Sequence, residues 1–589
     1  MDQQNHERVS GLAQEFSMLH LIAQNLAPIM FVVVLVLLLS GFPVAFVLAS
    51  AGLVFFAIGT WFSALAPEDI ALAWPLLQAQ PDRIFGIISN DVLLAIPFFT
   101  LMGLVFQRSG IAEELLSVVA RLFGRVRGGL CYAVILVGAL LAATTGVVSA
   151  SVMTMGLIAL PIMMRSGYHP HLAAGTITAA GTLSQIVPPS LVLIVMADQV
   201  MVPVGDIYRA ALVPSALMIG AYLVTILVIS LLVPSMLPHS NEDPPSRQDY
   251  KGIGLLLLAG VAGGFATHMS LAAIDHAPRL VLSSAAGGLA ALAAAWLGGQ
   301  HARVALVEGT TSARGAGVLL GGTRTGLTTD FARRAIYSVV PTLGLIFLVL
   351  GTIFLGVATP TESGALGATG ALLLVWLRGR WSKDDLQVCV LSTAKLTVFV
   401  FFILIGSRMF SLTFYGLGGD EWLHSLLAQL PGGRMGFIFY SMLAIFVLGC
   451  FLDFFEIAFI VVPLLLPVAQ ALEIDPLWFA ILISINLQTS FLTPPFGFAL
   501  FYLRSVASDG SGNDGLKVPN QAIYYGAIPF IVINLLVIAF IAVSPETVIP
   551  PKATFEPGAE STVDFRLGNQ GDVEAPTDNG NTNLNDLFK

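Results

Sequence analysis

The feature that most constrains this chain is a series of long apolar runs spread over most of its 589 residues. A helix needs about 20 apolar residues to cross a hydrocarbon core roughly 30 Å thick. Inside that core every backbone polar group must find an internal partner, so we expect an all-α, polytopic protein embedded in a lipid bilayer. The runs expected to form helices are 26–48, 49–66, 84–107, 130–147, 150–164, 209–233, 252–270, 277–298, 335–356, 362–377, 385–407, 434–452 and 521–543.

The low charge content agrees with a membrane location. Asp, Glu, Lys and Arg make up 11% of the chain, against roughly 25% of a typical soluble domain. This excludes an ordinary cytosolic enzyme and argues against nucleic acid as a partner. The formal net charge is −9, and residues 544–589 contribute −5 of it through eight acidic and three basic side chains. We therefore expect 546–589 to be an acidic, disordered tail.

Polar interruptions divide the chain into parts. We expect an N-terminal polar segment (1–25), a first membrane half (26–233), a linker with an extra two-helix insertion and a basic loop (234–334), and a second membrane half (335–545) before the tail. Basic clusters at 121–127, 299–334 and 378–383 should face the cytoplasm. The three cysteines lie inside apolar runs without metal-site or disulfide spacing, and we interpret them as buried apolar side chains.

The two halves share a proline pattern. Pro161, Pro170, Pro188 and Pro189 recur 306 residues later as Pro467, Pro476, Pro494 and Pro495, and Ser184 recurs as Ser490. Four coincidences at one offset indicate an internal duplication. Duplicated, interrupted helices are typical of secondary transporters. We expect helical hairpins near 171–200 and 477–503, although a single proline pair could simply kink a packed helix.

The residues around these breaks are candidates for binding ions or substrate. Carbonyls and hydroxyls can replace the hydration shell of Na⁺, and the N–H groups of a broken helix can hold a carboxylate. The candidates at the first break are Thr182, Ser184, Pro188 and Pro189, with Ser149 and Ser151 upstream of it. The candidates at the second break are Asn486, Gln488, Thr489, Thr493, Pro494 and Pro495.

A few charged residues lie in or beside apolar runs, where ionisable groups are costly and usually functional. Asp453 precedes one run, and Glu362 follows Thr359 and Thr361 at the start of another. Either acid could instead form an internal salt bridge or cap a helix. Arg408 could pair with one of them or contact a substrate carboxylate, and Lys395 is a weaker candidate for the same roles.

With these residues in view, the sequence resembles the large permease subunit of tripartite ATP-independent periplasmic (TRAP) transporters, in a longer subgroup with a central insertion. The resemblance rests on the order and spacing of several short motifs. They are Ala95-Ile96-Pro97-Phe98-Phe99, the 124–129 stretch, Gly146 to Ser151, Ile186 to Ser190, Ala358 to Glu362, Phe451-Leu452-Asp453, and Leu492 to Gly497. Together they span about 90–230 and 335–545.

The resemblance implies an inverted-repeat, elevator-type transporter of the bacterial inner membrane. It implies Na⁺-coupled uptake of an organic acid that a periplasmic binding protein delivers, with a small four-helix membrane subunit as a further partner. Hairpin tips would lie near 182–190 and 488–497. No cofactor is expected besides Na⁺ as the coupling ion, for which the candidate ligands are Ser184, Thr361, Asp453, Thr489 and Thr493.

Other functions fit the residues less well. A standalone ion-coupled symporter or antiporter of the wider ion-transporter superfamily is the alternative within the same class. An enzyme is not expected, because the chain has no His-Glu-x-x-His, Gly-x-Ser-x-Gly or phosphate-loop motif. A receptor or structural membrane protein does not explain duplicated broken helices, and no polar stretch is long enough for the nucleotide domain of a primary pump.

Overall fold

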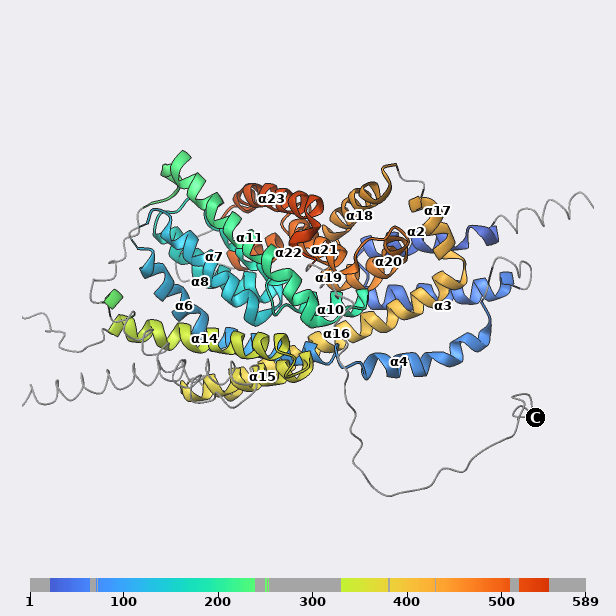
Figure 1. Ribbon diagram of the computed structural model, residues 1–589, viewed down its shortest axis with the longest axis horizontal. Coiled ribbons are helices and arrows are strands. Elements are labelled where there is room, and N and C mark those ends of the chain that lie inside the picture. The colour runs from blue at the N-terminus through green and yellow to red at the C-terminus, as the bar shows by residue number, and fades with distance from the viewer. Residues whose placement is uncertain are drawn as a thin grey trace, which may run out of the picture. The chain divides into compact units, whose positions relative to one another are not determined.

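A computed structural model describes residues 22–63, 70, 72–124, 126–238, 249–251, 253, 330–379, 382–428, 431–508 and 518–549. Every regular element in these ranges is a helix, which confirms the all-α prediction (Figure 1). The chain divides into two units, Met1–Pro550 and Pro551–Lys589. Almost all of the expected 1–25 segment, the 234–334 insertion and the 546–589 tail lies outside the described residues.

The N-terminal part contains α2 (Leu26–Leu39), α3 (Val44–Ser63), η1 (Trp74–Ala79), α4 (Gln80–Ile88), α5 (Ala95–Arg108) and α6 (Ile111–Leu122). The expected first run, 26–48, is interrupted at 40–43. Gly41 takes a left-handed conformation (φ 81°), which glycine adopts without a steric penalty, and Pro43 follows it. The break between the first two helices therefore precedes the expected boundary at 48/49. Helices α5 and α6 bend by 63° relative to each other.

The remaining helices form the two repeat halves and a connection between them. The first half contains α7 (Gly129–Thr145), α8 (Val148–Arg165), α9 (Pro170–Thr182), η2 (Leu183–Gln185), α10 (Leu191–Val200), α11 (Val204–Leu232) and η3 (Pro234–Met236). The connecting helices are α14 (Asp330–Phe354), α15 (Pro360–Leu377), α16 (Lys383–Gly416) and α17 (Gly419–Ala428). The second half contains α18 (Gly433–Gly449), α19 (Phe454–Glu456), the π-helical turn η4 (Ile457–Val461), α20 (Val462–Ala471), α21 (Pro476–Phe491), α22 (Phe498–Ser508), α23 (Asn520–Val543) and η5 (Pro545–Thr547).

The duplication is visible in the helix boundaries. Helix α8 spans 148–165, and α19 through α20 spans 454–471, so both boundaries keep the offset of 306 residues. Helices α9 and α21 begin at Pro170 and Pro476. Proline suits the first position of a helix, because the N–H group that it lacks would have no partner within the helix there. The proline repeat thus marks equivalent places in two structurally related halves.

The hairpins do not lie where the sequence placed them. Helix α9 packs against α7, α8 and α23, whereas α10 packs against α21, α11 and α20, so the 171–200 segment is a broken helix rather than a hairpin. The 477–503 segment is interrupted in the same way between α21 and α22. The antiparallel pair is α7–α8, whose ends meet where the Leu130 N–H donates to the Tyr168 hydroxyl (3.2 Å). Its tip is Gly146–Val147, and the repeat relates it to α18 and α19–α20.

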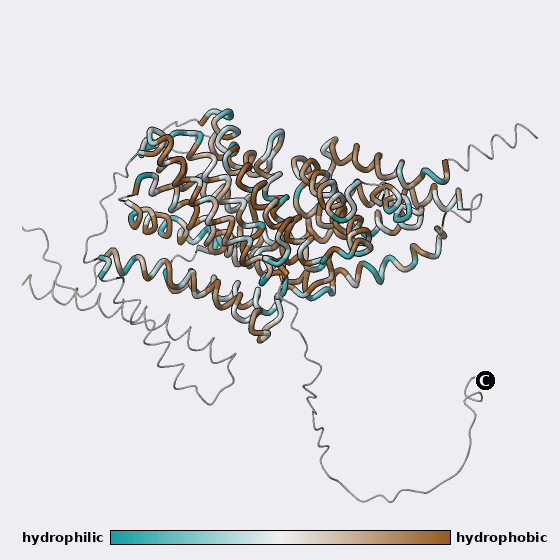
Figure 2. The backbone as a smooth tube through the Cα atoms, turned by 45° about the horizontal axis from the view of Figure 1, so that its top comes forward, coloured by the Kyte–Doolittle hydropathy of each residue, from teal (hydrophilic) through white to brown (hydrophobic). Residues whose placement is uncertain are grey.

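Apolar surface covers the described helices. Seven of them are long and apolar enough to cross a membrane, or eight if the bent α5–α6 pair counts as one span. Hydrophobic residues predominate along these helices in Figure 2. Large side chains such as Leu231, Leu232 and Val543 are more than 70% exposed, which suits lipid-facing positions and costs free energy in water. The structure thus agrees with a multi-pass membrane protein.

Two of the basic clusters lie at one end of the helices. Arg121, near the end of α6, stacks on Phe331 at the start of α14 (4.5 Å to the ring centre). Arg378, directly after α15, pairs with Glu114 of α6 (3.1 Å). The start of α16 at Lys383 follows. The positive-inside rule predicts that this end faces the cytoplasm. The third cluster, apart from its last residues, lies outside the described ranges.

Candidate functional site

A cavity of about 490 Å³ lies between the tips of the two repeat-related helix pairs, and we call it the central cavity. One side is formed by Gly146–Ser149 at the α7–α8 tip, and the opposite side by Phe451–Glu456 before and within α19. Gln185 of the first break and the 41–44 turn complete much of the wall. Corresponding segments of the duplicated halves therefore meet at one place.

The two helices that start at this cavity carry different caps. The N-cap of α8 is Val147, which makes no side-chain capping hydrogen bond, so the first N–H groups of α8 stay available to an anion. The equivalent N-cap, 306 residues later, is Asp453. Its N–H donates to the Glu456 carboxylate (2.9 Å), and both acids line the cavity. The duplicated positions thus favour an anion on one side and a cation on the other.

The side-chain amide of Gln185 has no hydrogen-bond partner in the part of the chain that the structure describes. Its side chain is fully buried, and neither its Oε1 nor its Nε2 has a hydrogen-bond partner among the described residues. Leaving a buried amide unsatisfied costs about 1–3 kcal/mol per group. Since Gln185 also lines the central cavity, a ligand there would satisfy both atoms.

Ser190 organises the backbone at the first break. Its hydroxyl donates to the carbonyls of Ser184 (2.6 Å) and Gln185 (3.1 Å) and accepts from the Val192 N–H (3.2 Å), which caps α10. One side chain therefore holds the end of η2 against the start of α10 and fixes the position of Gln185.

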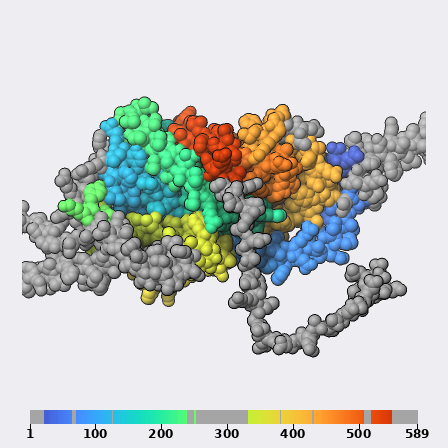
Figure 3. All heavy atoms as spheres, viewed as in Figure 1, coloured from blue at the N-terminus to red at the C-terminus, as the bar shows by residue number. Residues whose placement is uncertain are grey.

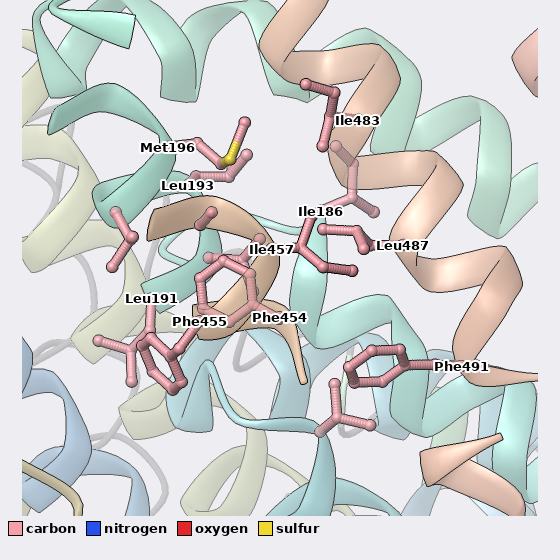
Figure 4. Close-up of a cluster of buried hydrophobic side chains, with 14 of the residues drawn as sticks. Ile186, Leu191, Leu193, Met196, Phe454, Phe455, Ile457, Ile483, Leu487 and Phe491 are labelled. Carbon is pink, nitrogen blue, oxygen red and sulfur yellow. The ribbon is translucent and has the colours of Figure 1, made fainter. Parts of the chain in front are cut away.

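An apolar cluster packs against the segment Phe451–Glu456, which we call the acidic tip because it carries Asp453 and Glu456. In Figure 4, Phe454 and Ile457 lie between Leu191 of α10 on one side and Ile186 and Leu487 on the other. All five side chains are at most 4% exposed. Close packing of this kind resists small displacements, so α19 is held firmly between the two broken helices.

Of the residues predicted from the sequence, Ser149 and Asp453 line the central cavity. Sequence reasoning missed Gln185 and Glu456. Gln185 sits next to the predicted Ser184, and Glu456 is three residues after Asp453, the spacing of a capping box. That spacing is the signal that could have identified Glu456.

The other candidates of the first break are buried but bonded within their own segments. The hydroxyls of Thr182 and Ser184 donate to the carbonyls of Ala179 and Gly181, both at 2.9 Å. Ser151 shares a hydrogen bond with Thr145 (2.7 Å). Pro188 and Pro189 are joined by a cis peptide bond and are buried.

The candidates of the second break behave similarly. Thr489 and Thr493 donate to carbonyls one turn earlier, at 3.0 and 2.9 Å. Asn486 donates to the Met442 carbonyl (2.6 Å), and Gln488 donates to the Tyr222 hydroxyl (2.9 Å). Tyr222 in turn donates to Asn534 (2.8 Å), so this network ties α21 to α11 and α23. Pro494 and Pro495 are exposed and joined by a cis bond.

Three further candidates, at the start of α15, are not among the residues that line the central cavity. Thr359 and Glu362 form a capping box: the Thr359 N–H donates to the Glu362 carboxylate (2.8 Å), and the Glu362 N–H donates to the Thr359 hydroxyl (3.3 Å). Thr361 donates to the Asp91 carbonyl. Helix α15 packs on α5 and α14. The structure therefore favours the helix-cap interpretation of Glu362 over an ion site.

The two basic candidates are also separate from the cavity. Arg408 and Lys395 are exposed on α16, and neither is among the residues that line the central cavity. The structure therefore does not bring Arg408 to the central cavity, which Asp453 and Gln185 line.

Comparison with known proteins agrees with this arrangement. The family model for the DctM component of tripartite ATP-independent periplasmic transporters matches residues 31–547. The C4-dicarboxylate TRAP transporter large permease protein DctM of Pseudomonas aeruginosa is 25% identical over 464 residues, covering 79% of this chain and 86% of its own. The sialic acid TRAP transporter large permease protein SiaM of Vibrio cholerae is 21% identical, covering 84% and 95%.

A solved structure shares the fold. The Alcanivorax borkumensis YdaH transporter superimposes with a TM-score of 0.51 at 14% identity, covering 85% of this chain and 97% of its own. The chain belongs to the DctM-component family and is a large permease subunit of a TRAP transporter, in the bacterial inner membrane.

Proposed function

We propose that this permease couples Na⁺ entry to the uptake of an organic carboxylate, which binds in the central cavity. The observation that carries the proposal is the pair of duplicated helix starts. Val147 leaves the N-terminus of α8 uncapped, while Asp453 and Glu456 put two carboxylates at the equivalent start of α19.

The charge of the cavity supports cation coupling. Two acids line the same cavity, and neighbouring carboxylates repel unless a cation or a proton neutralises one of them. Carboxylate, hydroxyl and amide oxygens are hard ligands that suit Na⁺ better than softer metals. A bound cation would in turn attract the substrate carboxylate, so that each ligand improves the binding of the other.

The substrate class is supported by the anion-binding end of α8 and by the relatives. Free N–H groups at a helix N-terminus suit a carboxylate, and the free amide of Gln185 adds a donor and an acceptor. The relatives named for C4-dicarboxylates and for sialic acid carry substrates with carboxylate groups. Family membership further supports a periplasmic binding protein and a small four-helix membrane subunit as partners.

The packing of the helices supports an elevator motion. Helices α3, α5, α14, α15 and α16 pack on one another, through the α3–α16, α5–α15, α5–α16 and α14–α15 contacts. The hairpin and broken helices that enclose the cavity pack on one another, through α7–α9, α8–α9 and α8–α22, and they meet the first group along α5–α7. Figure 3 shows α14 and α15 below the first-half helices. We propose that the second group carries the cavity past the first.

The first experiment measures cation binding without knowing the substrate. The thermal midpoint of the purified permease is recorded in NaCl and in choline chloride at equal ionic strength. Na⁺ at about 100 times its Kd should stabilise the wild type by about 2.7 kcal/mol, and Asp453→Asn should remove that gain.

The second experiment measures uptake by the complete complex in proteoliposomes, with succinate and N-acetylneuraminate as probes. Uptake should require both a Na⁺ gradient and the binding protein. Equal uptake in choline, or uptake without the binding protein, would show that the coupling mechanism is wrong.

A further inference from the structure

A second cavity of about 290 Å³ adjoins the central one, and we call it the side cavity. The two cavities share Val147, Ser149 and Leu396 in their walls. The rest of the side cavity is lined by α5, through residues such as Thr100 and Arg108, by α16, and by further residues of α7 and α8. It therefore lies between the α7–α8 tip and the α5–α16 pair, along the boundary between the two packed groups of helices.

Arg108 is one of the residues that line the side cavity. It is the last residue of α5 and pairs with Asp385 in the first turn of α16 (3.2 Å), with both side chains about half exposed. A further small space of about 30 Å³ is lined by Arg108 and Asp385 together. The ion pair therefore lies beside the side cavity and next to the 378–383 basic cluster, since Asp385 follows Lys383 in the first turn of α16.

The two cavities differ in the charged side chains that line them. The residues that line the central cavity include Asp453 and Glu456 but neither Lys nor Arg. Among those that line the side cavity, Arg108 is the one charged residue. Thr100 is 3% exposed, its hydroxyl has no hydrogen-bond partner among the described residues, and it lines the side cavity. An anion that moves from the central cavity into the side cavity would therefore find an unsatisfied hydroxyl and a guanidinium there.

We propose that the side cavity is the exit for the anionic substrate toward the cytoplasm, and that Arg108 receives its carboxylate by exchanging Asp385 for it. Arg forms bidentate pairs with any carboxylate, and an exposed ion pair such as Arg108–Asp385 is weak enough to exchange. The identity of the anion rests on the proposed function, but the anion selectivity of the cavity does not.

The test uses a cysteine in the side cavity and two thiol reagents of opposite charge. Ser392→Cys is placed in the full-length chain with Cys131, Cys389 and Cys450 changed to Ala, since Ser392 lines this cavity. Inside-out and right-side-out membrane vesicles are treated with anionic sulfonatoethyl or cationic trimethylammonioethyl methanethiosulfonate. In inside-out vesicles the anionic reagent should label Cys at 392 about tenfold faster than the cationic one.

Substitutions of the two members of the ion pair should change the labelling rate of the anionic reagent in opposite directions. Arg108→Gln should slow the anionic reagent, whereas Asp385→Asn should accelerate it, because Arg108 then loses its compensating charge. A merely structural ion pair would give the same change in both variants. Arg108→Lys should retain the selectivity. The control is Arg209→Gln, which removes an exposed Arg–Asp pair on α11 (3.5 Å) and should leave both rates unchanged.

Equal rates for the two reagents, faster labelling in right-side-out vesicles, or parallel effects of Arg108→Gln and Asp385→Asn would overturn the proposal. These outcomes differ from failure of the proposed function. If Na⁺ coupling is wrong, Na⁺ stabilisation and uptake fail while the charge-selective labelling persists. If the exit is wrong, uptake remains Na⁺-dependent and the labelling loses its selectivity.

Discussion

Two buried glutamines near the first break differ in whether their side-chain amides are hydrogen-bonded, and this difference indicates their roles. Gln199 is 8% exposed, and its Nε2 donates to the Asp198 carboxylate (2.8 Å). Gln185 is fully buried, and its amide has no partner among the described residues. A buried amide that keeps its hydrogen bonds stabilises the fold, whereas one kept without them is better explained by a ligand.

Gln185→Leu should therefore leave the thermal midpoint unchanged or raise it, because it replaces an unsatisfied amide by an apolar group of similar size. Substrate affinity should fall about tenfold, as expected for the loss of roughly 1.4 kcal/mol of hydrogen bonding to the ligand. Gln199→Leu is the matched control, with a lower midpoint and unchanged affinity. Uptake kinetics and a melting curve on the same preparations check both, and unchanged affinity in Gln185→Leu would remove it from the site.

Asp453 and Glu362 could not be separated from sequence, because each is an acid beside an apolar run. The structure separates them by surroundings: Asp453 lines the central cavity, whereas Glu362 is exposed and caps α15. Glu362→Gln should keep Na⁺-dependent uptake, since Gln can also complete a capping box. Asp453→Asn should abolish it. The pair is measured in one uptake assay with membrane insertion checked by immunoblot, and equal losses would contradict the assignment.

At the scale of elements, the sequence predicted where the helices break but not which distant helices the broken segments pack against. The repeated prolines mark both breaks to within a few residues, because proline stops a helix locally. Whether the chain then turns back or continues depends on contacts with distant helices, such as α9 with α23 and α10 with α21. Those contacts leave little trace in a local pattern, which is why the hairpins were expected at the breaks instead of at α7–α8.

The contact between α9 and α23 depends on two glycines. A Cβ added to Gly175 would lie 1.9 Å from the Gly526 carbonyl oxygen, and one added to Gly526 would lie 2.0 Å from the His171 carbonyl oxygen. The backbones therefore touch, as small residues allow in membrane helix pairs. Neither glycine stands out in the sequence, since 57 residues are glycine.

Gly175→Ala should force α9 and α23 apart and destabilise the protein by about 1–3 kcal/mol, the usual cost of overpacking. Gly220→Ala is the control, because a Cβ there meets no atom within 4 Å and alanine favours the helix. The thermal midpoint of each detergent-solubilised variant reports the effect. If Gly175→Ala has the same thermal midpoint as the wild type, the two helices do not approach as closely as described.

At the scale of the whole described membrane part, the proposed elevator requires one packed group of helices to slide along the other. Helix α16 belongs to the first group, and α20 follows the acidic tip in the second. The Tyr415 hydroxyl donates to the Pro463 carbonyl (3.1 Å), which joins these two helices. Neither residue is among those that line the central cavity, so a cross-link there tests movement without filling the substrate site.

Tyr415→Cys with Pro463→Cys, joined by a short bis-methanethiosulfonate, should reduce uptake to background, and a reductant should restore it. The control joins two helices of the same group: Thr352→Cys with Ser363→Cys links α14 to α15, whose hydroxyls share a hydrogen bond (2.9 Å). That link should leave uptake intact because these helices move together. Full uptake with the first cross-link formed would mean that α20 does not slide along α16, and transport would then need a local gate at the cavity instead of an elevator.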